Sequence, residues 1–379
     1  MGILQLCKFF PPDWGGVETV SYNLMQGLGL LGVENGAIAF GSSERTDYIE
    51  NSGVTSPVYR IRGLIVLKRA PVSMKYFLRF RKVMRDYESV IVHLPNPFAA
   101  LCILLSGYRG RVILYWHADI VGKGLYGLLL SPLELMLIHR SNAVVGATSA
   151  HINASRHARF LQGKSHVIAY PVSTALAETA RRRLGTPRRA ARVPARLLAI
   201  GRLVAYKGFD VLIRSLMLID IECRLDILGE GPLQRDLQSI VDKLGLTSRV
   251  TLHGAVSEEI REQFLTDADI FCLPSTTRAE MFGVVQLEAM AHGVPVISTD
   301  LPGSGTPEFT RQSGGGVVVS PGNEGALASA ITRLVRNEDL YARLSAAGIA
   351  VVSDQTGQMN SLRRLVGVCA GEAKQGHST

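Results

Sequence analysis

The sequence predicts an α/β protein with two Rossmann-like, doubly wound domains, and three observations favour this class. Short runs rich in Val, Ile and Leu alternate with longer segments of helical periodicity, which is typical of parallel βαβ units. The pattern is interrupted at residues 174–195, where arginines and prolines gather, and then starts again. The length of 379 residues fits two domains of ~100 to 200 residues each.

Apolar runs predict six strands in the first half, each bounded by polar or turn residues. They lie near residues 3–7, 37–40, 90–93, 112–115, 143–146 and 167–168. A helix is expected after the first strand, beginning at a pair of glycines and running to about Leu31. We assign residues 1–180 to an N-terminal domain.

The second half repeats the pattern with six more expected strands. They lie near residues 197–200, 224–228, 250–252, 270–273, 295–298 and 316–319. We assign residues 190–354 to a C-terminal domain and place the junction in the arginine-rich interruption.

The composition indicates a folded core without structural disulfides or zinc. Hydrophobic residues make up 47% of the chain and charged residues 19%, a balance that argues against disorder. The cysteines form an odd, scattered set without C-x-x-C pairs or ligand spacing: Cys7, Cys102, Cys223, Cys272 and Cys369. A disulfide scaffold and a zinc module are therefore both disfavoured.

The amino-terminal sequence MGILQLCKFF lacks the basic start, long apolar core and small-residue cleavage site of a signal peptide. The most apolar stretches, residues 98–105 and 125–138, are too short or too interrupted to span a bilayer. We therefore expect a cytoplasmic protein without a transmembrane helix.

Charge is divided unevenly between the halves. Residues 1–190 hold 23 basic and 11 acidic residues, which leaves +12, while residues 191–379 hold 18 and 21, which leaves −3. A basic half is compatible with nucleic acid, an anionic membrane or a phosphorylated substrate, and charge alone does not distinguish them.

The loops that follow the strands are where an open parallel sheet binds ligands. In the first such loop, Gly15 and Gly16 stand at the expected helix start, where backbone N–H groups can approach an anion. A tight strand-to-helix turn is an equally good explanation of these glycines. His117 follows the fourth strand, with Asp119 and Lys123 nearby, so it is a candidate site residue, although a lone histidine is more often structural.

Two segments of the second half suggest a sugar nucleotide site. Arg202 and Lys207 follow a strand, and these two cations suit a diphosphate, although a solvated basic turn would look similar. Glu280 and Glu288 flank an expected helix start near Gly283. Two carboxylates could bind the hydroxyls of two rings while the amides of the helix start hold the phosphates. Taken singly, the glutamates could be solvated helix positions and Phe282 a core residue.

Together these segments resemble the retaining glycosyltransferases of family 4, which have the GT-B fold, two Rossmann-like domains facing across a cleft. The resemblance rests on Gly201-Arg202 through Lys207-Gly208, on Glu280 and Glu288 separated by seven residues, and on further motifs along the chain. These are Gly15-Gly16, His117, Leu228-Gly229-Glu230-Gly231-Pro232, His253-Gly254 and Leu273-Pro274-Ser275. The segments around His93 and Trp116 are similar to bacterial enzymes that build O-antigen or exopolysaccharide chains, several of which use GDP-mannose.

The resemblance implies roles for individual residues. His117, Arg202, Lys207 and Glu280 would be catalytic, with Arg202 and Lys207 on the diphosphate and with Glu280 and His117 at the donor sugar. Glu288 would bind the ribose. The other implied donor-binding residues are Gly15, Gly16, Gly229, His253, Gly254, Ala255, Phe282, Gly283, Val284 and Val285.

The resemblance also implies a hexosyltransferase without a catalytic metal or cofactor, the nucleotide sugar being a co-substrate. Asp267-Ala268-Asp269 matches a metal-binding D-x-D string of another transferase fold, but here it is expected to cap a helix end. A final helix at about residues 355–370 would cross back to the N-terminal domain. Two alternatives stay open, a UDP-sugar-dependent transferase and a non-catalytic nucleotide-sugar-binding subunit.

A basic segment between residues 60 and 85 suggests a membrane contact. It carries Arg60, Arg62, Lys68, Arg69, Lys75, Arg79, Arg81, Lys82 and Arg85 among aromatic and apolar residues. A helix over residues 72–87 would present cations beside apolar side chains, as interfacial helices do, and a solvated helix face is equally compatible. With a polyprenyl-diphosphate-linked or oligosaccharide acceptor, we expect peripheral attachment to the inner face of the cell membrane. The chain has no recognisable nucleic-acid module, so nucleic acid is not a predicted partner.

Overall fold

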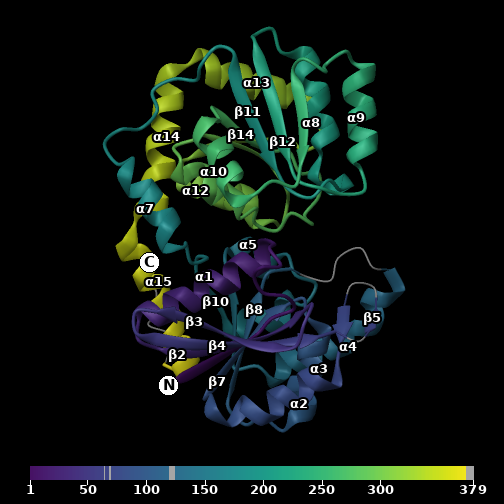
Figure 1. Ribbon diagram of the computed structural model, residues 1–379, viewed down its shortest axis with the longest axis vertical. Coiled ribbons are helices and arrows are strands. Elements are labelled where there is room, and N and C mark those ends of the chain that lie inside the picture. Colours follow the sequence, from purple (N-terminus) through teal and green to yellow (C-terminus); the bar gives the residue numbers. More distant parts are fainter. Residues whose placement is uncertain (64, 68–69, 119–123, 373–379) are drawn as a thin grey trace. The chain divides into compact units, whose positions relative to one another are not determined.

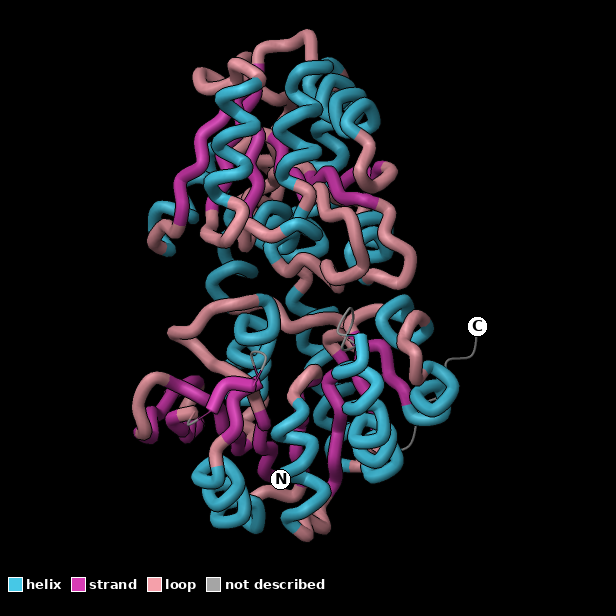
Figure 2. The backbone as a smooth tube through the Cα atoms, turned by 90° about the vertical axis from the view of Figure 1, so that its right-hand side faces the viewer, coloured by secondary structure: helices cyan, strands magenta, loops and turns pink. Residues whose placement is uncertain are grey.

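The chain forms two compact units in the computed structural model, which describes residues 1–63, 65–67, 70–118 and 124–372 (Figure 1). One unit joins Met1–Ser173 to the segment from Thr356 onward, and the other is Thr174–Gln355. In each unit the strands run through the middle and helices lie around them (Figure 2). Each unit is a layered α/β structure, as the repeated pattern predicts.

The first unit holds an eight-stranded sheet, counted over the described residues, in the order β10-β9-β8-β7-β1-β2-β4-β3. Its neighbouring strands are parallel except β3, which is antiparallel to β4. The strands are β1 Gly2–Leu6, β2 Glu34–Gly41, β3 Arg45–Asn51, β4 Val54–Arg62, β7 Ser89–Leu94, β8 Arg111–Trp116, β9 Ala143–Gly146 and β10 Ser165–Val167. A separate hairpin pairs β5 Ile65–Leu67 with β6 Ala70–Val72.

Six of these strands lie where the apolar runs predict them, whereas β3, β4 and the hairpin are additional. The sequence of β3, RTDYIEN, is mostly polar because the strand lies at the edge of the sheet and none of its residues is buried. β4 contains Pro57, and because proline is unusual inside a sheet, this segment does not predict a strand. Edge strands therefore escape a prediction that relies on burial.

The helices of the first unit come from two parts of the chain, the segment up to Ser173 and the C-terminal segment. They are α1 Gly16–Leu30, α2 Met74–Val83, α3 Pro97–Ser106, α4 Gly124–Arg140, α5 Ser149–Asn153, α6 Ala158–Leu161 and α15 Gln355–Ala370. The helix predicted over residues 72–87 is α2 followed by a 3₁₀ turn at Met84–Asp86. Ser89 Oγ donates to the carbonyl oxygen of Cys369 at 2.8 Å and so ties α15 to β7.

The second unit holds a six-stranded parallel sheet, in the order β13-β12-β11-β14-β15-β16. Its strands are β11 Ala195–Ile200, β12 Cys223–Leu228, β13 Val250–Gly254, β14 Ile270–Leu273, β15 Val296–Thr299 and β16 Gly316–Val319. Each lies where the sequence predicts one. The helices are α7 Thr174–Arg182, α8 Phe209–Ser215, α9 Gln234–Lys243, α10 Glu258–Asp267, α11 Val285–Ala291, α12 Gly305–Ser313, α13 Glu324–Arg336 and α14 Glu338–Ser353.

The arginine-rich stretch belongs to the second unit and is anchored there. Helix α7 packs on α11 and α14, so the first unit ends at Ser173, seven residues before the expected boundary at 180. Arg188 Nε donates to the carbonyl oxygen of His292 at 3.1 Å, and Arg192 pairs with Asp269 at 3.0 Å. These arginines, which make the stretch look like a linker, are bound to the body of the unit.

Candidate functional site

The loop after β11 carries the two cations predicted to hold a diphosphate. Lys207 is buried, and its Nζ lies 2.6 Å from Oε2 of Glu280. Gly201 has a φ of 155°, and a Cβ there would lie 3.0 Å from Lys207 Cε, so the glycine makes room for the lysine. Arg202 is exposed, and its guanidinium forms no ion pair within the described part of the chain. The loop thus offers one fixed cation and one available cation.

Glu280 lies in the loop between β14 and α11 and is almost completely buried, with 7% of its surface exposed. Its Oε2 also accepts a hydrogen bond of 2.9 Å from Ser275 Oγ, and Ser304 Oγ donates to its carbonyl oxygen at 2.5 Å. Lysine and serine therefore hold the carboxylate in one position. A carboxylate has about four lone-pair sites, so one that is paired and hydrogen-bonded in this way can accept further hydrogen bonds from a ligand hydroxyl.

The predicted phosphate-binding amides lie in the turn that opens α11. The first helical bonds run from Gln286 N to Gly283 O and from Leu287 N to Val284 O, each 2.9 Å. The N–H groups of Gly283, Val284 and Val285 precede these bonds, and such amides have no partner within their helix. Phe282 is buried, and its ring centroid lies 5.0 Å from that of Phe309, which favours the core role that the sequence left open.

Glu288 lies on α11 and faces an arginine of α10. Arg261 Nη1 is 3.2 Å from Glu288 Oε2, and Arg261 also pairs with Glu258 at 2.5 Å. Burial raises the pKa of the Glu288 carboxyl, while Arg261 acts in the opposite direction. Arg261, which sequence reasoning missed, thus supports the carboxylate predicted to bind the ribose.

The loops after β12 and β13 meet the loop after β11. Gly229 N donates to the carbonyl oxygen of Gly254 at 2.7 Å, and a Cβ on Gly229 would collide with the carbonyl oxygen of Gly201. The His253 ring nitrogen Nε2 lies 2.7 Å from Asp226 Oδ1. Gly229, His253, Gly254 and Ala255, which the resemblance implies to be donor-binding residues, therefore lie at the same edge of the second sheet as Arg202 and Lys207.

The predicted glycine loop of the first unit begins α1. Gly15 is the N-cap and Gly16 the first helical residue. A Cβ on Gly15 would collide with a carboxylate oxygen of Glu18, so an acidic side chain reaches back to the helix start. Burial raises the pKa of Glu18. Arg60 donates to the carbonyl oxygens of Phe10 and Pro11 and thereby fixes this loop, so it is not one of the surface cations expected from the basic segment.

His117 directly follows β8 and is buried, with both ring nitrogens engaged. Its Nε2 lies 2.9 Å from His93 Nδ1, and its Nδ1 lies 2.8 Å from Tyr170 Oη. Two neighbouring candidates lie outside the described residues, Asp119 and Lys123. So do two cations of the basic segment, Lys68 and Arg69. The sequence singled out His117 by its position after a strand, but it did not single out His93 or Tyr170 as partners.

The described residues contain no group of three or more His, Cys, Asp or Glu side chains that could hold a metal ion. In the D-x-D string, Asp267 ends α10 and pairs with Arg196 at 3.0 Å. Asp269 accepts from Arg192 and from the backbone N–H of Arg196. Both carboxylates are thus bound to arginines of the second unit, Asp267 at the surface and Asp269 in a buried position.

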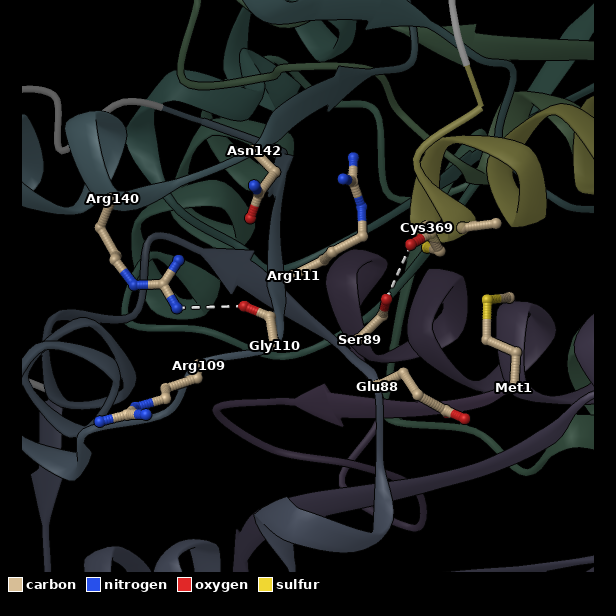
Figure 3. A pocket seen from close by; sticks show the side chains of 10 residues that line it. Met1, Glu88, Ser89, Arg109, Gly110, Arg111, Arg140, Asn142 and Cys369 are labelled. Atoms are coloured by element: carbon tan, nitrogen blue, oxygen red, sulfur yellow. Dashed lines mark hydrogen bonds between the residues drawn. The ribbon is translucent and has the colours of Figure 1, made fainter.

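A cavity of about 460 Å³ lies at the amino ends of β7 and β8, where none of the predicted site residues lies (Figure 3). Arg140 donates to the carbonyl oxygens of Tyr108 and Gly110 at 2.6 and 3.0 Å, and Arg111 to that of Val368 at 3.3 Å. These two arginines therefore tie loops and the end of α15 together.

Comparison with protein families divides the chain into two matched parts. Residues 14–194 match the model of Glycosyltransferase Family 4, and residues 189–351 match that of Glycosyl transferases group 1.

Two curated relatives match most of the chain. D-rhamnosyltransferase WbpZ of Pseudomonas aeruginosa is 28% identical over 340 residues, which are 87% of this chain and 86% of that protein. O-antigen chain mannosyltransferase C of Escherichia coli is 26% identical over 344 residues, or 89% of this chain and 90% of that protein.

Solved structures share the fold over nearly the whole chain. HepE of Anabaena, determined in complex with UDP-glucose, has a TM-score of 0.72 and 17% identity, covering 98% of this chain and 100% of that one. Sucrose-phosphate synthase from Thermosynechococcus elongatus has a TM-score of 0.73, 17% identity and the same coverage.

Proposed function

We propose that the chain, which belongs to the glycosyltransferases, moves a hexose from a nucleotide sugar onto a lipid-linked or saccharide acceptor. A Glycosyltransferase Family 4 region is followed by a group 1 region, and the two form a GT-B fold. The best candidate for the donor is GDP-mannose, and the best candidate for the pathway is bacterial O-antigen or exopolysaccharide synthesis. Support comes from relatives named as an O-antigen chain mannosyltransferase and a D-rhamnosyltransferase.

The observation that carries the proposal is the pairing of Lys207 with Glu280, together with Arg202 on the same loop as Lys207. The Arg202 guanidinium forms no ion pair among the described residues. Arg202 and Lys207 would hold the leaving diphosphate and stabilise the charge that develops on it. Glu280 would accept hydrogen bonds from hydroxyls of the donor sugar, and Glu288 from those of the ribose. Gly16, Gly229 and the amides of Gly283, Val284 and Val285 would let the backbone approach the donor.

We propose transfer with retention of configuration. The acceptor hydroxyl would attack from the face that the diphosphate leaves, and an oxygen of the departing diphosphate would take its proton. The two cations would neutralise the diphosphate without a divalent metal. Turnover is therefore expected to persist in excess EDTA, and loss of turnover that added Mg²⁺ or Mn²⁺ restores would contradict this part.

The test of donor identity is binding followed by transfer. Thermal shift of the full chain against GDP-mannose, UDP-glucose, UDP-N-acetylglucosamine and the free nucleotides is expected to give the largest stabilisation with GDP-mannose. A preference for a UDP-sugar would favour the alternative of a UDP-sugar-dependent transferase, for which the solved complex of HepE with UDP-glucose gives a specific reason.

Transfer of labelled sugar to a polyprenyl-diphosphate-linked acceptor then separates an enzyme from a binding subunit. Donor-induced stabilisation without any transfer or hydrolysis of the labelled donor would favour the non-catalytic alternative and would contradict the proposal.

A further inference from the structure

A continuous line of buried hydrogen bonds joins three strands of the first unit to the chain segment after β10. Gln5 Oε1 lies 2.8 Å from His93 Nε2, His93 Nδ1 lies 2.9 Å from His117 Nε2, and His117 Nδ1 lies 2.8 Å from Tyr170 Oη. All four side chains are buried, with 0 to 6% of each residue exposed. We call this line the histidine chain.

The register of the parallel strands explains why these side chains meet. Gln5 pairs with Ile91, so His93 lies two residues further along the adjacent strand and on the same face. His93 pairs with Tyr115, so His117 lies two residues further again. Because side chains alternate between faces with a period of two, the line steps diagonally across one face toward the carboxyl edge.

The rings are also stacked, which leaves His117 little freedom to turn. Its centroid lies 5.2 Å from that of His93 with an interplanar angle of 10°, and 5.0 Å from that of Tyr115 with an angle of 14°. Tyr170 lies 5.4 Å away on a tilted plane. Orientation is thus fixed by packing as well as by hydrogen bonds.

The hydrogen-bond partners determine which ring nitrogen of each histidine carries the proton. The Gln5 carbonyl oxygen can only accept, so His93 donates from Nε2 and, being neutral, carries a lone pair on Nδ1. His117 must then donate from Nε2 and accept at Nδ1, where the Tyr170 hydroxyl donates. Each neutral ring therefore has one proton, and its position follows from the neighbour.

Burial keeps the rings neutral. It lowers the pKa of His93 to about 3 and holds the pKa of His117 well below its ordinary value, with smaller effects from His93 and His151. The titratable rings around His117 in the described part of the chain are His93, His151, Tyr115 and Tyr170, and no carboxylate is among them. Among these described groups, an imidazolium would have no counter-charge.

We propose that His93 and Tyr170 are positioning residues, which hold the His117 ring in one orientation with its proton on Nε2. The inference rests on the proposed function only in that the family resemblance places His117 at the donor sugar of such a transferase. Because both ring nitrogens are engaged within the histidine chain, the ring would offer the sugar a fixed, neutral edge rather than a free nitrogen. Such a ring adds no positive charge near a reaction centre that itself becomes positive. Tyr170, at the end of the histidine chain opposite Gln5, lies three residues before the end of the first unit.

The structure supplies a matched pair of variants. Tyr170→Phe removes the hydroxyl that ends the histidine chain and keeps the ring. Tyr115→Phe makes the same change in the same stack, but the Tyr115 hydroxyl is buried without a hydrogen-bond partner among the described residues. Tyr170→Phe removes a hydrogen bond to His117, whereas Tyr115→Phe removes a hydroxyl that has no such bond among the described residues.

The first readout is kinetic. Tyr170→Phe is expected to lower kcat by about tenfold or more while the KM for the donor changes little, because misorientation of a reacting-site group acts on the transition state. Tyr115→Phe should leave both parameters close to wild type. Equal effects of the two variants would overturn the positioning role.

The second readout does not require activity. Long-range ¹H–¹⁵N spectra of the full chain with ¹⁵N-labelled histidine report which ring nitrogen carries the proton, and His117→Gln identifies the His117 signals. Neutral rings protonated on Nε2 are expected for His93 and His117, and Tyr170→Phe should shift His117 Nδ1 whereas Tyr115→Phe should not. A proton on His117 Nδ1, or an imidazolium at neutral pH, would overturn the inference even if transfer is confirmed. The expected spectra in a protein without transferase activity would instead refute the proposed function alone.

Discussion

Lys207 and Glu280 form a buried ion pair, and removing one partner leaves the other charge without compensation. Lys207→Ala is therefore expected to reduce both stability, by about 3 kcal/mol, and turnover, by roughly 100-fold or more. Arg202 is exposed and forms no ion pair among the described residues. Arg202→Ala should lower turnover while leaving the free energy of unfolding unchanged, as measured by urea denaturation and initial rates.

The control for this comparison is an exposed arginine of α14. Arg343→Ala changes the same charge on the same unit outside the predicted site, and it should leave turnover and stability unchanged. Wild-type turnover in Arg202→Ala, or the same loss in Arg343→Ala, would contradict the assignment of Arg202 to the diphosphate.

His93 makes the stability of the protein depend on pH. Its pKa is lowered to about 3 by burial, whereas an unfolded histidine titrates near 6.5, so between these values only the unfolded state binds the proton. Stability therefore falls as pH decreases below about 6.5, and this residue alone should cost about 2 kcal/mol between pH 7 and pH 5. Urea denaturation of His93→Gln at both pH values should show a smaller difference than wild type.

The exposed His139 provides the reference for this measurement. His139→Gln should retain the full pH dependence of the wild type, because that side chain lies at the surface of α4. An unchanged pH dependence in His93→Gln would mean that His93 is charged in the folded state.

At the scale of elements, the turn between Glu280 and α11 depends on Gly283. It has a φ of 65°, and a Cβ would collide with the Leu273 side chain of β14. Gly322 has the same φ in an open turn, with no atom within 4 Å of a Cβ. Gly322→Ala should thus cost about 1 kcal/mol from backbone strain, whereas Gly283→Ala should cost more and also lower donor affinity. Calorimetry with and without donor measures both effects, and equal losses in the two variants would rule out the steric explanation.

The sequence predicts elements well where burial shapes it and poorly elsewhere. Each run of Val, Ile and Leu that predicts a strand forms one. β3 and β4 lack that signal, because β3 is an edge strand and β4 contains Pro57. Of the site, the loops after β11 and β14 could be found from their glycines and charges. Their partners could not, because Ser275 and Arg261 are joined to Glu280 and Glu288 only by the fold.

The histidine chain has a trace in the local sequence of two strands. Gln5 and His93 are polar residues inside otherwise apolar strands, GILQL and SVIVHL, and a buried polar residue needs a partner. Which partner it finds depends on strand order, and the order β8-β7-β1 is not readable from local pattern. Tyr170 lies after a three-residue edge strand and had no signal of its own.

At the scale of the whole molecule, the positive charge of residues 1–190 contrasts with the slightly negative second half. No helix within the described residues is both long and apolar enough to cross a membrane. We propose that the acceptor is met at an anionic surface through α2. Its Met74 and Leu78 are 64% and 55% exposed, and Arg81, Lys82 and Arg85 beside them are exposed cations.

Binding to anionic vesicles tests this surface. Each cation near such a membrane contributes about 1 kcal/mol, so Arg81→Ala with Lys82→Ala should weaken binding by roughly tenfold or more, while Arg343→Ala should not. Raising the salt from about 0.1 M to about 1 M shortens the screening length from ~10 to ~3 Å and should release the wild type. Sedimentation with vesicles of phosphatidylglycerol and phosphatidylcholine, against phosphatidylcholine alone, measures each effect. Binding that persists at high salt, or that is equal on neutral vesicles, would show that the basic surface serves another purpose.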